Sequence, residues 1–212
     1  MFPCIVIRKK ESPIRKAIIF TLLSIFLISG LFAQVVDLND VINKQVTLNA
    51  NGNGSSSGFS VDGFIHNFGS RNLRISTAVK NGLYLKNSGA GQNMVVIAVY
   101  EEDGSYFIDG KYGYIELKAL TRTPVSFIAF CADFNKENPS SKESFSVAAM
   151  PAEIKEIAAK ISRYAADHDD DDLTRAGQLA LWFAQGETAS SISAKFDFDS
   201  DDEAIARQIA SY

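Results

Sequence analysis

Cys131 and Gln178 are the two residues of this sequence whose types and settings point to chemistry. The chain of 212 residues has two cysteines. The first, Cys4, precedes an apolar run in a segment that we expect to be removed on export. Cys131 is then a single cysteine in an oxidising compartment, where it cannot form an internal disulfide. Two interpretations stay open: a reactive thiol, or a small hydrophobic side chain packed in a core.

Gln178 lies in the stretch RAGQLALWFAQG, residues 175–186, which has the periodicity of an amphipathic helix that ends at Gly186. At about 100° per residue, Gln178 and Trp182 fall one turn apart on the polar side of this helix. An indole left in water loses favourable burial, so we expect this second face to be covered as well. A covered Gln178 must then find a partner for its amide.

The strand-like FCAD around Cys131, followed downstream by the helical QLALW, resembles the thioester domains of bacterial surface adhesins. In that family, the cysteine sulfur displaces ammonia from the glutamine of a Gln-x-x-apolar-Trp motif and forms an intramolecular thioester. The resemblance implies that Cys131 is the thiol, Gln178 the acyl donor and Trp182 a cover against water. It also implies covalent attachment to an amine or hydroxyl of a target.

The resemblance spans about residues 127–185 and has departures from the family pattern. Gly177 stands where the family usually has Thr, and the separation of Cys131 from Gln178 is shorter than in the family. The alternative interpretation is structural: Gln178 hydrogen-bonds a strand edge, Trp182 docks the helix, and Cys131 is buried nearby.

The N-terminus has the order of a secretory signal peptide. A basic segment from Arg8 to Lys16 precedes an apolar run, 17–32, and a small residue, Ala33, stands before Gln34. The apolar run is short for a membrane-spanning helix. We therefore expect residues 1–33 to be cleaved, with an uncleaved anchor as the alternative. The product is then secreted, periplasmic or on the cell surface.

The charge of the expected mature chain narrows the class of partner. Loss of residues 1–33 removes five Lys or Arg and one Glu from totals of 21 and 25, which leaves 16 basic against 24 acidic side chains. An acidic protein is a poor partner for nucleic acid or for an anionic membrane. No second apolar run of membrane length follows, so we expect no membrane contact after cleavage.

Two periodicities divide the remaining chain. Residues 34–150 contain short β-branched and aromatic runs broken by turn residues, which predict strands. After Pro151 a helical period begins, and it predicts helices over about 151–165, from the acidic run 169–172 to 186, and over 201–211. We therefore predict an α+β fold, with an N-terminal antiparallel β-sandwich over 34–150 and a small C-terminal helical subdomain, 151–212, packed on it.

Metal and hydrolytic sites lack support in the sequence. The acidic runs DHDDDD and DFDSDDEAIARQ do not have EF-hand spacing, and both precede helices, where carboxylates complement the helix dipole. In the second run, Ser200 and Glu203 have the spacing of a capping box. His66 and His168 are isolated from any zinc spacing. We expect no metal, no cofactor and no enzymatic activity.

The function predicted from these observations is an exported, thioester-domain-like binding protein whose partner is an extracellular protein or glycan. The alternative is a non-covalent β-sandwich interaction or glycan-binding protein. Aromatic side chains of the strands would supply its stacking surface, namely Tyr84, Tyr106, Tyr112 and Tyr114.

Overall fold

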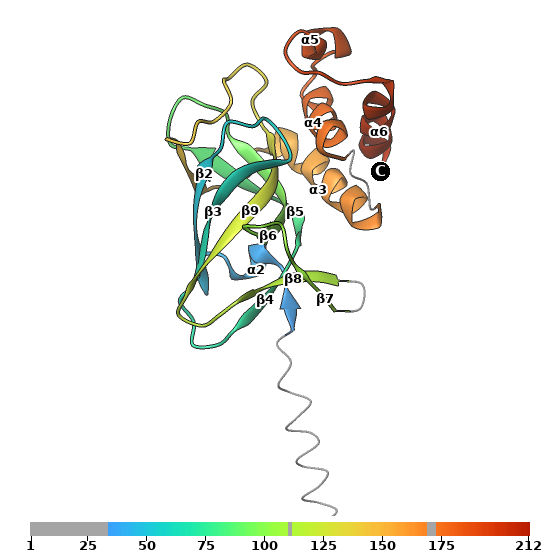
Figure 1. Cartoon of the computed structure of the whole chain (residues 1–212). Helices are drawn as coiled ribbons and strands as arrows, with labels where there is room; N and C mark the ends of the chain where they lie inside the picture. Colours follow the sequence, from blue (N-terminus) through green and yellow to red (C-terminus); the bar gives the residue numbers. More distant parts are fainter. Residues whose placement is uncertain (1–33, 110–111, 169–172) are drawn as a thin grey trace, which may run out of the picture. The chain divides into compact units, whose positions relative to one another are not determined.

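Apart from one short helix near the start, strands come first and helices last in the computed structural model, which describes residues 34–109, 112–168 and 173–212 (Figure 1). The expected signal peptide lies outside the described residues. The strands are β1 (Val35–Val36), β2 (Val46–Gly52), β3 (Phe59–Asn67), β4 (Leu73–Ser76), β5 (Ala78–Asn87), β6 (Met94–Glu101), β7 (Phe107–Asp109), β8 (Tyr112–Leu117), β9 (Arg122–Cys131) and β10 (Ser144–Val147). The helices are α2 (Leu38–Val41), α3 (Ala152–Asp167), α4 (Leu173–Ala184), α5 (Ala189–Ser193) and α6 (Ser200–Ser211).

Six strands form a closed barrel in the order β10–β2–β3–β9–β6–β5. The short strand β10 closes it, because Phe145 lies opposite Ala50 of β2 on one side and Asn87 of β5 on the other. The predicted α+β fold with an N-terminal antiparallel β-sandwich is therefore wrong, since the structure is mostly β, with a barrel, a second sheet and a few helices. A strand alternates its side chains in the same way in a sandwich and in a barrel, so the sequence pattern did not indicate closure.

The second sheet has the order β1–β4–β8–β7. The segment NLRISTAV has the pattern of one strand, but it divides at Thr77 into β4 of this sheet and β5 of the barrel. The main chain of Thr77 joins the two sheets: its N–H donates to the carbonyl of Gly113 in β8, and its carbonyl accepts from Val99 in β6.

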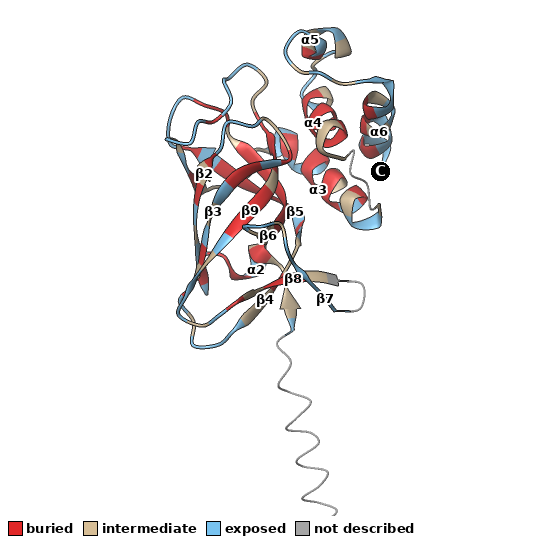
Figure 2. Cartoon of the chain, viewed as in Figure 1, coloured by how far each residue is buried: buried red, intermediate tan, exposed pale blue. Residues whose placement is uncertain are grey.

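The two faces of β9 contact different parts of the molecule. Phe130 is fully buried and lies against Gly177 of α4. Successive side chains of a strand point to opposite faces, so Ala129 and Cys131 point away from the helices and into the barrel. The position of Cys131 opposite Met94 of β6 agrees with this assignment. Figure 2 shows the buried residues gathered along the barrel strands and on the facing sides of α3 and α4.

Helix α3 packs against β5, and α4 packs against β9, α3 and α6, whereas α2 contacts β5 apart from these helices. The capping box of α6 is formed by Asp199 and Asp202 and not by the expected Ser200 and Glu203, because Asp199 accepts hydrogen bonds from the N–H groups of both Asp201 and Asp202. Within the described residues, no helix is both long and apolar enough to cross a bilayer.

Candidate functional site

Cys131 is the last residue of β9 and is completely buried at one end of the barrel. Its sulfur lies 3.8 Å from Sδ of Met94 and 3.9 Å from Oδ1 of Asn138. Asn138 belongs to the connection between β9 and β10, and its Nδ2 donates to the carbonyl of Gly54 in the β2–β3 loop. The exposed Asn138 side chain thus bridges two loops at the end of the barrel that holds the thiol.

Gln178 meets Cys131 across 47 residues of sequence. The N–H of Cys131 donates to Oε1 of Gln178 at 2.7 Å, and Nε2 of Gln178 donates to the carbonyl of Cys131 at 2.9 Å. The N–H of Cys131 also donates to the carbonyl of Ser56, at 3.2 Å. Gln178 has no exposed surface. The amide carbon of Gln178 is therefore held beside Cys131, and the hydrogen bonds run to the main chain of Cys131.

Gly177 allows helix α4 to approach β9 closely enough for this contact. A Cβ at position 177 would lie 2.6 Å from Cζ of Phe130, which is closer than van der Waals contact permits. Phe130 immediately precedes Cys131 and is fully buried. Glycine at this position thus has a local cause, because the ring of Phe130 fills the space of a larger side chain.

Trp182 is buried, with 3% of its surface exposed. The sequence predicts this for Gln178 and Trp182 together, since they share one face of the helix. The ring of Trp182 makes edge contacts with Phe134, at 5.2 Å between centroids, and with Phe196, at 5.4 Å. Phe134 follows Cys131 by three residues, so Trp182 packs on the segment that leaves the thiol. Among the described residues, its buried Nε1 is the side-chain polar atom left without a hydrogen-bond partner. Its role as a cover for the thioester stays a prediction.

The environment of the thiol keeps it protonated. Burial, and then the negative charge of Asp133, raise the pKa of Cys131 to about 12. A thiol is a weak nucleophile until it loses its proton. Reaction at this sulfur consequently requires a base or a leaving group that takes up the proton during the step.

Other residues considered in the sequence have structural settings. Tyr84 and Tyr114 are buried, whereas Tyr106 is half exposed; nothing is described for the side chain of Tyr112. Within the described parts of the chain, no three His, Cys, Asp or Glu side chains are grouped closely enough to hold a metal ion. The acidic residues at 169–172 lie outside those parts.

Sequence reasoning singled out Cys131, Gln178 and Trp182, and the structure gathers all three around the end of β9 and the middle of α4. It missed Asn138 and Ser56, which lie in loops of polar residues without a motif. Comparison with known proteins adds no relative: no family model matches the chain, and neither a curated protein nor a solved structure matches it.

Proposed function

We propose that this protein is an exported binding module that attaches covalently to its target through a thioester between Cys131 and Gln178. The observation that carries the proposal is the pair of hydrogen bonds between the Gln178 amide and the main chain of Cys131, in a fully buried setting. These bonds hold the Gln178 amide at the residue that carries the thiol, and holding two reacting groups in one site lowers the entropic barrier to their reaction. The sulfur itself lies against Met94 and Asn138, so the reaction requires the Cys131 side chain to turn toward the amide.

The proposed bond forms by acyl transfer within the chain. The sulfur of Cys131 attacks Cδ of Gln178, the carbon–nitrogen bond breaks, and Nε2 leaves as ammonia together with the proton of the thiol. A nucleophilic amine of the target then attacks the same carbon, forms an amide with residue 178 and returns the proton to the sulfur. No oxidant or cofactor enters either step.

Two features of the site support this chemistry. The N–H of Cys131 donates at 2.7 Å to Oε1, the oxygen on which negative charge develops during attack. A preorganised donor at such an oxygen stabilises the transition state. Burial of Gln178 and Trp182 keeps bulk water from the acyl carbon, which protects a thioester against hydrolysis.

Intact mass spectrometry of freshly purified protein tests the proposal. A thioester lowers the mass by about 17 Da through loss of ammonia, and methylamine then converts it to a species about 14 Da above the calculated mass. The Cys131→Ala variant is the control and has its full calculated mass. A wild-type protein with its full mass, unchanged by methylamine, would falsify the proposal.

Export is a separate part of the proposal and rests on the N-terminal sequence. Expression of the full chain in a bacterial host is expected to yield a mature protein that begins at Gln34 and is recovered outside the cytoplasm. N-terminal sequencing of the recovered protein measures this directly. A full-length chain retained in the cytoplasm contradicts export without bearing on the thioester.

A further inference from the structure

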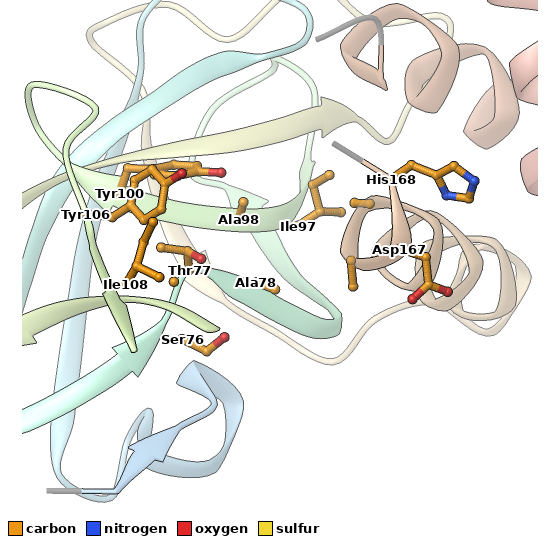
Figure 3. A pocket seen from close by; sticks show the side chains of 13 residues that line it. Ser76, Thr77, Ala78, Ile97, Ala98, Tyr100, Tyr106, Ile108, Asp167 and His168 are labelled. Carbon is orange, nitrogen blue, oxygen red and sulfur yellow. The ribbon is translucent and has the colours of Figure 1, made fainter. Parts of the chain in front are cut away.

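We propose a second binding site, for a neutral carbohydrate, in the cleft between the β7–β8 hairpin, β6 and the C-terminal end of α3 (Figure 3). The cleft has a volume of about 660 Å³, within the range of small-ligand sites. It lies at the other end of β6 from the thiol, because Tyr100 in the cleft pairs with Ser126, whereas Met94 pairs with Cys131. Binding there is independent of the thioester proposed above.

An aromatic platform forms one wall of the cleft. The ring of Tyr106 is half exposed and contacts Tyr100 edge-on at 5.5 Å between centroids, and Tyr100 contacts Phe59 in the same way at 5.6 Å. Figure 3 shows Tyr100 and Tyr106 together at one end of the cleft. Rings held in this way lose little conformational entropy when a ligand stacks on them.

Gly113 of β8 holds Tyr106 in place. A Cβ at this position would lie 2.6 Å from Oγ1 of Thr77 and 3.0 Å from Cδ2 of Tyr106. The tyrosine ring therefore lies directly on the main chain of β8, and the hairpin approaches Thr77 closely. The platform depends on glycine at this one position.

Hydrogen-bonding groups lie on both sides of the cleft, with Ser76 and Thr77 near the platform and Asp167 on the side of α3 (Figure 3). Within the described chain, the hydroxyls of Ser76 and Thr77 line the cleft without making a side-chain hydrogen bond. Asp167, at the end of α3, accepts from the hydroxyl of Tyr212 and keeps other lone pairs for a ligand. Small side chains between the two walls, among them Ala78 and Ala98, leave the space open.

This combination fits a pyranose ring better than an anion. A pyranose has a C–H face that packs on an aromatic ring and hydroxyls at its edge that match Ser76, Thr77 and Asp167. No Lys or Arg is among the described residues that line the cleft. Among these residues a phosphate, sulfate or sialic acid finds His168 as the one basic side chain, whose Nδ1 lies 3.0 Å from the carbonyl of Tyr164, and it meets the carboxylate of Asp167.

The test uses the Cys131→Ala variant, which cannot form a thioester, so that only reversible binding is measured. It is applied to an array of neutral oligosaccharides with sialylated and sulfated counterparts, and the strongest neutral glycan is titrated by calorimetry. We expect neutral glycans to bind, and the added change Tyr106→Ala to weaken binding at least about tenfold. Phe64→Ala is the matched control, because Phe64 is equally exposed (47% against 49%) but lies outside the cleft, and it is expected to leave binding within about twofold.

Three results overturn the proposal: no neutral glycan retained on the array, binding that Tyr106→Ala leaves unchanged, or a preference for the anionic counterparts. Gly113→Ala gives a second measurement that leaves the Tyr106 side chain present. It displaces the ring and is expected to weaken glycan binding in a protein whose circular dichroism shows it to be folded. None of these results bears on the mass deficit expected for the thioester.

Discussion

The side-chain amide of Gln178 occupies the place of a neighbouring strand beside Cys131. It accepts from the N–H and donates to the carbonyl of that one residue, at 2.7 and 2.9 Å. The arrangement stabilises the fold as long as the Gln178 amide is intact. It supplies the Cys131 carbonyl with a donor at the buried end of β9, where an unpaired polar group is costly.

Replacing Gln178 with Ala is expected to lower the free energy of unfolding by about 2–4 kcal/mol, because it leaves a cavity and removes the donor to the Cys131 carbonyl. Gln178→Glu is expected to cost at least as much, since a carboxylate would face that carbonyl in a buried site. Urea unfolding followed by circular dichroism measures both changes. The control is Gln185→Ala, an exposed residue immediately after α4, with an expected change within about 0.5 kcal/mol. Equal effects of Gln178→Ala and Gln185→Ala would show that the buried hydrogen bonds do not stabilise the fold.

Gly177→Ala is expected to destabilise the protein by about 1–3 kcal/mol, because the new methyl group meets the buried ring of Phe130 at 2.6 Å. Replacing the ring with the smaller side chain of leucine, in Phe130→Leu, makes room for the methyl group. The double variant is therefore expected to be more stable than the sum of the two single effects predicts, by about 1 kcal/mol in a double-mutant cycle. Strict additivity contradicts the contact and leaves the Gly at this position unexplained.

The sequence predicted the positions of strands and helices better than the way the strands join. Alternation located the strands and helical spacing located α3, α4 and α6, because both depend on local side-chain periodicity. Closure of the barrel depends on β10 pairing with β2 and β5, which are distant in sequence, and no local pattern records it.

Gln178 and Trp182 could be identified because both lie on the polar face of an amphipathic helix, where a tryptophan is unexpected. Large or amide side chains on the polar side of an apolar helix indicate a second covered face, and the structure buries both. The partner of Gln178 was not predictable from periodicity, since the hydrogen bonds run to main-chain atoms that every residue carries. Asn138 was missed for a related reason: its contact with the thiol depends on how a loop folds over the end of the barrel.

Trp182→Phe is expected to change the free energy of unfolding by less than about 1.5 kcal/mol, whereas Trp182→Ala costs about 3–5 kcal/mol. Phe keeps an aromatic ring between Phe134 and Phe196 and removes Nε1, which has no partner among the described residues. Removal of this unpaired buried donor is favourable, and it offsets part of the stability that is lost with the smaller buried area. Urea titration of the two variants measures the difference. A Phe variant as unstable as the Ala variant would mean that the indole N–H makes an important bond.

The raised pKa of Cys131 predicts how stability depends on pH in molecules whose thiol is free. The pKa rises from 9.0 to about 12 on folding, because of burial and then of the charge of Asp133. As the pH rises through this window, the unfolded chain loses its thiol proton first, so the thiol's contribution to stability is complete below pH 9 and is lost toward pH 12. Cys131→Ala lacks this contribution, which isolates it from other titrating groups. The stability difference between wild type and variant is therefore expected to shrink between pH 8.5 and pH 10.5, by up to about 1.4 kcal/mol per pH unit. Urea unfolding of both proteins across this range measures the difference.

Alkylation of the folded protein at pH 8 gives a second readout, since the thiolate fraction is roughly a thousandfold lower than for an exposed thiol. Rapid alkylation without unfolding, or a stability difference that stays constant with pH, would place the sulfur in contact with solvent.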